Sequence, residues 1–418
     1  MNNTQEIIQR LHTQIQNTMT AMPADEKTDC LAALQFPGVS IDPSEYDETG
    51  LSDSLIQMLD SGVHIQAAFQ PADSSLYRMY GQILDNTKLP ASQDLSTEEQ
   101  QRLKIAQKYI RNNSAEYQKY YDRYLDIQTE LMAAKSRTAR TAAQMKMKRL
   151  TQEWSAHGRQ KYEEYSNIIR ELHVSSPASY FTSARENYEL YTNADVLLAP
   201  AHWYDGDSGL SWTSMSLSAD SSESSASSQT SSSSRVLEKF YQTPGIWSEI
   251  AGWFGIRKGK TVTTELNELV QKANTEFSSS NMNMTWKMMP VTVRRPWLDL
   301  NVLALKDAKI AGTAPGAYST GKLSPDNRGT IPGYITSFIV AKDIQMTMTL
   351  SKDIAESLKE NSSSITCGLL SNGKTNPVNI EKTHEDRQKG TSDVTISADS
   401  GVQLIGYIIR PFPRFPGA

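Results

Sequence analysis

The chain has 418 residues, of which 38% are hydrophobic and 21% charged, with 42 Lys plus Arg against 47 Asp plus Glu. At about 150 residues per domain this length predicts two or three domains, and no apolar run approaches the roughly 18 to 20 residues of a membrane-spanning helix, which excludes an integral helical membrane protein. The net charge of −5 argues against a dedicated nucleic-acid-binding protein, which normally carries a broad basic excess.

Helical patterns dominate the N-terminal half. In residues 4–19, Ile7, Ile8, Leu11 and Ile15 recur at helical spacing, which predicts an amphipathic helix. Shorter helical patterns cover residues 51–59 and 74–84. The next 67 residues, from 91 to 157, contain neither proline nor glycine and are rich in Gln, Glu, Lys, Arg and Ala, a composition typical of long helices.

A heptad-like seam runs along this long segment. Apolar and aromatic residues alternate at steps of three and four, and the seam residues that we expect to carry helix contacts are Tyr117, Tyr120, Tyr124, Ile127 and Leu131. The seam returns after the midpoint, around Leu150 and Trp154, with a possible break at Gly158. Two arrangements fit this pattern: a single long rod, or an antiparallel hairpin that turns near residues 111–114 or within 135–144.

The chain changes character near residue 195, where Ser, Thr, Gly, Pro and β-branched residues become frequent. Fourteen of the 24 residues from 211 to 234 are serine, which predicts a flexible loop at about 213–234. Strand patterns follow at residues 284–294, 335–348, 365–370, 394–397 and 402–409, and helical patterns at 264–277 and 351–359. We therefore predict an α+β protein: a helical domain at residues 1–193 with long coiled-coil-like helices, then a mainly antiparallel, sandwich-like β domain at 194–418.

Motifs for catalysis, cofactors and metals are weak. Residues 316–323 resemble a phosphate-binding loop up to Lys322, but Leu323 replaces the required hydroxyl residue and no helix pattern follows. His202 with Asp205 and Asp207, and His384 with Glu385 and Asp386, are more typical of solvated turns than of metal sites. We predict no catalytic residue, no cofactor and no metal, although a dispersed active site in the β domain is a further possibility.

A basic stretch lies in the long helical segment. Residues 135–149 contain six cations and no carboxylate: Lys135, Arg137, Arg140, Lys146, Lys148 and Arg149. Such a stretch is commonly a solvated helix face; alternatively it docks an acidic protein partner or an anionic membrane surface. Nucleic acid is the weakest alternative, because no aromatic residues are interleaved for base stacking.

A second candidate surface lies at residues 243–260, which combine aromatic and aliphatic residues with a basic end. The residues that would form a partner or membrane surface are Trp247, Ile250, Trp253, Phe254, Arg257 and Lys258. The same composition suits a segment that crosses the β-domain core and leaves through a charged loop. Farther on, Pro296 is expected to end a strand, with Arg294 and Arg295 paired to carboxylates.

These patterns favour a non-enzymatic interaction or structural protein that self-associates, as a homo-oligomer, or docks partners through its helical domain. The alternative is a membrane-interacting or toxin-like effector that uses the Trp-rich segment and the basic helix face. The start of the chain shows no secretory signal, and two cysteines more than 300 residues apart predict no disulfide framework. We expect a cytoplasmic protein, or one exported by a non-classical route.

Overall fold

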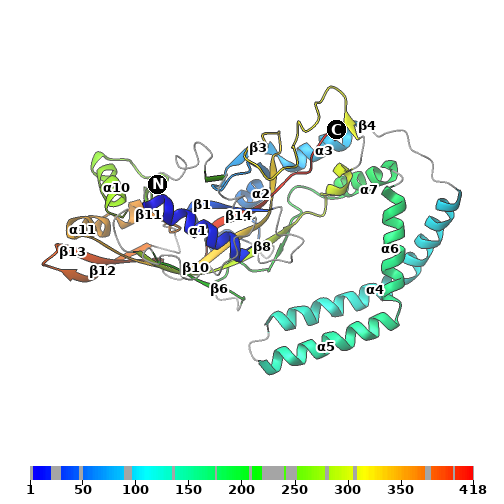
Figure 1. The fold of residues 1–418 in the computed structure, drawn as a ribbon, viewed down its shortest axis with the longest axis horizontal. Coiled ribbons are helices and arrows are strands. Elements are labelled where there is room, and N and C mark those ends of the chain that lie inside the picture. Colours follow the sequence, from blue (N-terminus) through cyan, green and yellow to red (C-terminus); the bar gives the residue numbers. More distant parts are fainter. Residues whose placement is uncertain are drawn as a thin grey trace. The chain divides into compact units, whose positions relative to one another are not determined.

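The computed structural model describes residues 3–19, 30–46, 50–88, 97–133, 137–174, 177–206, 210–218, 240–241, 252–277, 282–304, 308–371, 378–398 and 401–417 (Figure 1). Helices and a many-stranded antiparallel sheet are both present, which confirms the α+β class. The chain divides into two compact units, here called the sheet unit and the helical unit. The sheet unit comprises Met1–Tyr80, Tyr191–Pro296 and Ala314–Pro416, and the helical unit Gly81–Leu190, Trp297–Thr313 and Gly417–Ala418.

This division differs from the predicted boundary at residue 193, because the first 80 residues belong with the sheet. The reason is a long-range strand pairing: β1 (Leu31–Ser40) lies antiparallel to β14 (Gln403–Pro411), with Leu31 opposite Ile409. Composition along the chain carries no signal for a pairing across more than 350 residues. The helical unit is correspondingly smaller than predicted.

One large antiparallel sheet is organised around the 19-residue strand β10 (Gly333–Ser351). One edge of β10 pairs with β14 over its first half and with β13 (Thr391–Ala398) over its second half. The other edge pairs with β8 (Met282–Arg294). The remaining strands extend the sheet outward: β2 (Ser61–Val63), β3 (Pro71–Ser75), β5 (Leu197–Ala199), β6 (Thr213–Ser218) and β12 (Val378–Asp386). The predicted sandwich arrangement stays a prediction.

Two helices pack near the far half of β10. They are α10 (Thr264–Phe277) and α11 (Lys352–Glu360), and both match the predicted helical patterns. Each buries one apolar face; in α10 this face includes Leu269 and Phe277. The other elements of the sheet unit are α2 (Asp53–Leu59), η1 (Pro43–Glu45), η3 (Ser362–Ser364) and the pair β7 (Phe254–Ile256) with β11 (Ile365–Cys367). α3 (Leu76–Asn86) spans the boundary between the two units.

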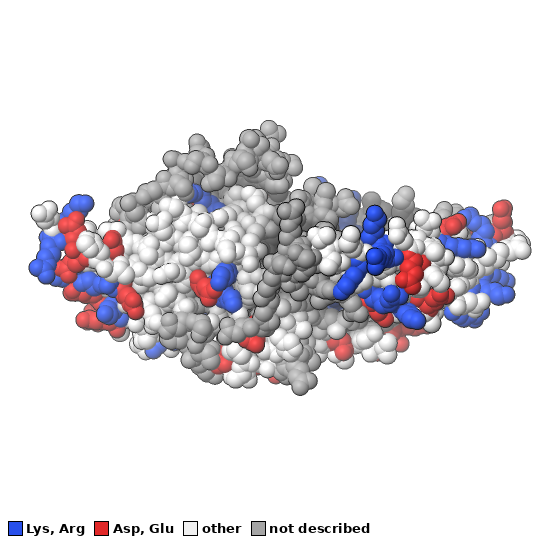
Figure 2. All heavy atoms as spheres, turned by 90° about the horizontal axis from the view of Figure 1, so that it is seen from below, with Lys and Arg blue, Asp and Glu red and all other residues white. Residues whose placement is uncertain are grey.

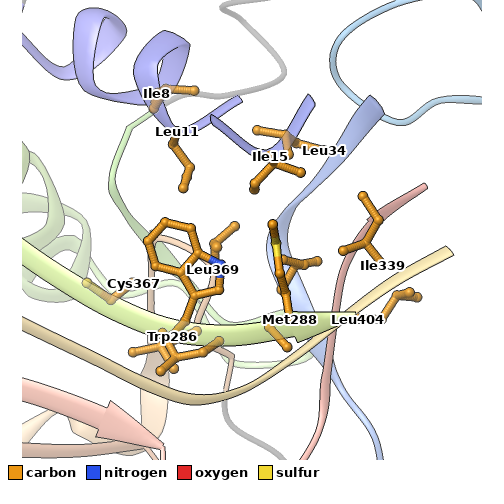
Figure 3. Close-up of a cluster of buried hydrophobic side chains, with 14 of the residues drawn as sticks. Ile8, Leu11, Ile15, Leu34, Trp286, Met288, Ile339, Cys367, Leu369 and Leu404 are labelled. Carbon is orange, nitrogen blue, oxygen red and sulfur yellow. The ribbon is translucent and has the colours of Figure 1, made fainter. Parts of the chain in front are cut away.

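The core of the sheet unit lies partly beneath α1 (Asn3–Met19), whose apolar stripe was predicted. Ile8, Leu11 and Ile15 point from α1 toward the side chains of Trp286 and Met288 on β8 (Figure 3). Leu11 and Ile15 are fully buried, and β8 alternates buried and exposed residues over its first half. Burial of this apolar stripe is what stabilises α1 on the sheet.

Polar side chains of α1 also bond to the backbone of β1. His12 Nε2 lies 2.5 Å from the carbonyl oxygen of Ala32, and its Nδ1 lies 2.6 Å from the hydroxyl of Tyr241. The Gln16 amide accepts from the Ala32 N–H and donates to the Cys30 carbonyl. Because His12 is 1% exposed, burial lowers its pKa to about 4.

The helical unit consists mainly of four helices: α4 (Thr97–Ala133), α5 (Arg137–Ala156), α6 (Arg159–Val174) and α7 (Pro177–Leu190). It also contains β4 (Thr87–Lys88) paired with β9 (Lys309–Ile310), and η2 (Leu300–Ala304). α4 continues through residues 111–114, so the chain does not turn there. No helix among the described residues is long and apolar enough to cross a membrane.

Two local predictions need correction. The predicted serine-rich loop begins later than residue 213, because β6 occupies Thr213–Ser218 and pairs with β8; residues 219–239 lie outside the described part of the chain. As predicted, β8 ends at Arg294, before Pro296. Arg295 is buried and donates to the carbonyl oxygens of Ile335 and Leu59, both at 2.8 Å. Within the described part of the chain it forms no direct ion pair, although the charge of Asp60 acts on it. Burial lowers its pKa to about 10.

Candidate functional site

The seam residues gather around one tryptophan in the helical unit. Tyr120, Leu150 and Trp154 form a small buried cluster, against which Tyr117, Tyr124 and Ile127 pack. Trp154 and Leu150 are each 2% exposed and Tyr120 is 7% exposed. Leu131 lies on α4, but its side chain is outside the described part. The seam is therefore satisfied within the chain over the described residues.

The rings of this aromatic junction lie close together. The centroid of Tyr117 is 3.9 Å from that of Tyr162 in a stacked geometry and 5.0 Å from that of Trp154. Tyr120 and Tyr124 lie 6.4 and 6.1 Å from Trp154. Such ring pairs contribute about 0.5–1.5 kcal/mol each beyond the burial of their area.

The order of these contacts shows that α4 runs antiparallel to its partners. Tyr124 and Tyr120 meet Trp154 of α5, Tyr117 meets Tyr162 of α6, and Tyr109, farther toward the start of α4, meets Tyr165. As predicted, the helix breaks between α5 and α6 at Gly158. The φ of this residue is +83°, a left-handed conformation that favours glycine at a helix end. A single rod from α4 through α6 is excluded by these contacts.

Ion pairs border the aromatic junction on one side. The Tyr120 hydroxyl donates to Glu153 at 3.2 Å, and Arg123 lies 3.5 Å from the same carboxylate oxygen. Burial, together with the neighbouring Glu153 carboxylate, raises the pKa of Tyr120. The guanidinium carbon of Arg159 lies 4.5 Å from the centre of the Trp154 ring. These contacts fix the positions of the rings.

The basic helix face is only partly described. Lys146, Lys148 and Arg149 are exposed on α5, and Figure 2 shows basic and acidic side chains intermingled over the helical unit. Arg137 and Arg140 lie on α5, but their side chains are outside the described part, as is the whole of Lys135. Over its 20 residues α5 carries five basic residues against one acidic residue, Glu153. α5 itself therefore carries an excess of four positive charges.

The predicted Trp-rich surface requires a correction. Trp253 and Phe254 are 1% and 2% exposed, so they belong to the core and not to a docking surface. Trp253 stacks on Phe277 at 4.8 Å and its Nε1 donates to the sulfur of Met346 at 2.9 Å, while Phe254 begins strand β7. These side chains are buried because the segment leads into strand β7, which pairs with β11, and does not form a surface helix here.

The rest of that segment is described only in part. Lys258 is exposed and Arg257 is half-buried, and both follow strand β7. Trp247 and Ile250 lie outside the described residues. The Trp-rich segment therefore contributes two core aromatic residues and a basic end, which agrees with the core-crossing interpretation.

The weak motifs do not form sites in the described part of the chain. The loop at residues 316–323 is followed by no helix, and its Ser319 is buried, where it donates to the Phe412 carbonyl at 2.6 Å. Lys322 is exposed. Among the described residues no three His, Cys, Asp or Glu side chains converge as metal ligands. Asp207 lies outside these residues.

Comparisons with protein families, with curated proteins and with solved structures find no match. Sequence reasoning identified Trp154 as part of the seam, but it missed the pairing of His12 with Tyr241, because these residues lie far apart along the chain.

Proposed function

We propose that this protein is a non-enzymatic interaction protein whose helical unit docks an acidic protein surface through α5. In this proposal α4 to α6 act as a coiled-coil-like hairpin that displays α5, and the sheet unit is the rigid body that carries it. The observation that supports it most is the set of exposed cations on α5, Lys146, Lys148 and Arg149, in a helix with a single carboxylate.

The exposure of most described side chains of α4 also supports a role in docking. Among the described side chains of α4 only Ala106 and Tyr120 are buried, so most of this helix is surface. Ile105 and Met145 are 53% and 63% exposed. Exposed apolar side chains beside basic ones are typical of a surface that receives a partner.

The partner is an acidic surface of another protein or of a second copy of this chain, whose net charge is −5. Charge complementarity of this kind mainly increases the association rate and weakens as salt rises. Among the described residues, the membrane alternative loses Trp253 and Phe254, which are buried, and keeps the basic helix face together with Arg257 and Lys258.

The test compares two double charge reversals. Lys148→Glu with Arg149→Glu changes α5, and Lys258→Glu with Lys260→Glu is the matched control on exposed residues of the sheet unit. We would measure binding to fluorescent poly-glutamate by anisotropy and the mass of the protein by light scattering. Each measurement is made at 50 and at 300 mM salt, where the Debye length is roughly 14 and 6 Å.

Salt-sensitive binding of poly-glutamate, lost in the α5 variant and kept in the control, would support the proposal. A mass above the monomer that falls only in the α5 variant would identify a second copy as the partner. No binding and a monomer in all conditions would overturn docking through α5. If the wild type co-sediments with anionic vesicles but does not bind poly-glutamate, the membrane alternative would replace docking through α5.

A further inference from the structure

Helix α1 lies between two edge strands of the sheet. Through the centre of the sheet the strands follow in the order β6, β8, β10, β14 and β1. Within the described part of the chain, β6 has a ladder only with β8, and β1 has one only with β14. The side chains of His12 and Gln16 bond to the backbone of β1, so one side of α1 is held by this edge.

The opposite side of α1 bonds to β6. Residues two apart on a helix lie about 200° apart around its axis, so Arg10 and Gln14 lie on the other side of the helix from His12. Arg10 donates to the carbonyl oxygen of Ser218 at 2.7 Å, and Gln14 donates to that of Ser216 at 2.8 Å. α1 therefore closes the space between the two edges of the sheet.

The neutral form of His12 fits its surroundings at both ring nitrogens. The carbonyl of Ala32, 2.5 Å from Nε2, can only accept a hydrogen bond, so Nε2 carries the proton. Nδ1 then accepts from the hydroxyl of Tyr241 at 2.6 Å. A side chain that is 1% exposed thus has a partner for each of its polar atoms.

The elements around His12 provide no charge that would stabilise its protonated form. Burial, opposed by the bond to Ala32, sets the pKa of His12 at about 4, with no contribution from a charged side chain. Tyr241 keeps its own proton, because burial raises its pKa to about 12. β6 has no titratable residue. The other titratable or charged residues on α1, at the start of β1 and on β8 are Glu6, Arg10, Cys30, Lys287 and Arg294.

A second proton on His12 therefore favours the undocked helix. The proton would occupy Nδ1 and remove the acceptor of the Tyr241 hydroxyl, and it would leave a buried positive charge without a carboxylate partner. Once α1 leaves the sheet, the imidazolium is hydrated and its pKa returns to about 6.5.

Most of the sheet unit can stay folded without α1. The apolar residues that α1 buries in the shared core are Ile7, Ile8, Leu11 and Ile15. The far half of β10 instead packs with α10 and α11, which bury their own apolar faces. Loss of α1 thus removes one part of the core and leaves the other in place.

We propose that α1 is an acid-sensitive latch of the sheet unit, released from β1 and β6 when His12 takes up a proton, while the rest of the sheet stays folded. Release uncovers the side chains of Trp286 and Met288 on β8, toward which the apolar stripe of α1 points (Figure 3). The latch lies wholly within the sheet unit, so it is independent of docking through α5.

Hydrogen exchange of the full chain, read by mass spectrometry at pH 7 and pH 4.5, tests the latch. Protection factors are taken relative to the intrinsic exchange rate at each pH. With a pKa of about 4 docked and about 6.5 undocked, linkage predicts that the undocked fraction rises about 60-fold between these pH values. The amides of α1 should lose protection by about this factor, whereas those of α10 should change less than about threefold.

Three variants separate the role of His12 from that of its neighbours. His12→Gln can still form hydrogen bonds but does not titrate, so its α1 should be equally protected at both pH values. His64→Gln changes a half-buried histidine elsewhere in the sheet unit and should respond like the wild type. Gln16→Ala removes bonds to β1 without removing a titrating group, so it should lower protection at both pH values and keep the 60-fold dependence.

A pH series on the wild type keeps the test decisive if His12→Gln does not fold. Protection of α1 should fall between about pH 6.5 and pH 4 and level off on either side. A fall confined to below pH 4.5 would point to carboxylates and overturn the proposal. Equal loss in α1 and α10 would show unfolding of the whole unit, and a loss that persists in His12→Gln would exclude His12; either result would also overturn it.

Discussion

The two units of this protein differ in how many side chains their elements bury. In β14 the first seven of nine residues are buried, whereas α4 buries two of its described side chains, Ala106 and Tyr120. The sheet unit has one extensive core beneath and around β10, while in the helical unit α4 to α6 pack around a small cluster at Trp154, and further residues, among them Phe181, Trp297 and Leu303, are buried outside that cluster. The difference separates the extensive core of the sheet unit from α4, whose described side chains lie mostly at the surface.

Replacement of the central tryptophan is expected to have the largest effect. Trp154→Ala should cost about 3–5 kcal/mol, because it removes the ring on which Tyr117, Tyr120 and Tyr124 pack. With little other core, α4 to α6 should lose protection in hydrogen exchange while the sheet unit keeps it.

The matched change in the sheet unit is Trp286→Ala, also at a residue 2% exposed. It should have a similar cost but lower the protection of the whole sheet, because β8 and β10 share one core. Equal loss of protection in both units for either variant would contradict the contrast between the two cores.

A smaller effect is expected from pH and the two histidines. The pKa of His12 in the folded protein is about 4, below its unfolded value of about 6.5, so the unfolded state binds the proton first. The free energy of unfolding should therefore fall by up to about 1.4 kcal/mol per pH unit between about pH 6.5 and pH 4. Below pH 4 this contribution should level off.

His12→Gln should remove this part of the pH dependence, as measured by urea unfolding of the sheet unit at several pH values. His157→Gln is the control in the helical unit, where the His157 side chain is 51% exposed and lies 3.3 Å from Glu116. A pH profile unchanged by His12→Gln would show that His12 does not titrate on unfolding.

A still smaller effect is expected at Gly158. Gly158→Ala should cost roughly 1–2 kcal/mol, because alanine resists a φ of +83°. Its Cβ would also lie 3.1 Å from the Tyr109 hydroxyl. Gly390→Ala, at a φ of +65° with nothing within 4 Å of its Cβ, is the control in the sheet unit. If Gly158→Ala costs no more than Gly390→Ala in thermal unfolding, the contact with Tyr109 adds nothing to the backbone strain.

The smallest effect on stability should come from the docking face. Lys148→Glu with Arg149→Glu changes exposed side chains and should shift the free energy of unfolding by less than about 0.5 kcal/mol per substitution. Circular dichroism during thermal unfolding measures this. A larger loss would mean that these side chains support the helical unit itself, which would weaken their assignment to docking.

Local patterns predicted most helices and the central strands, because the period of apolar residues reports on one element at a time. The predicted strands at 284–294 and 335–348 correspond to β8 and β10, and α10 matches its predicted range. β1 was missed because Pro37 and a register shift between Leu34 and Val39 interrupt its pattern.

The candidate sites were harder to predict than the elements that carry them. The seam around Trp154 was visible because its residues lie at helical spacing. Trp253 is buried because α10 and β11 cover it. The sequence did not predict that either element packs against Trp253. The docking of α1 against β1 and β6 joins residues far apart along the chain, which leaves no local pattern.

The backbone groups on the edge of β1 that faces away from β14 are already hydrogen-bonded within the chain. Those at Cys30, Ala32 and Leu34 are taken by the side chains of His12 and Gln16 and by the backbone of Ala67 and Phe69. A strand of another chain therefore cannot form backbone hydrogen bonds with β1 at these positions. Chains that lose α1 would offer the groups at Cys30 and Ala32 as a template for strand exchange or aggregation, so α1 protects the solubility of the sheet as well as its core.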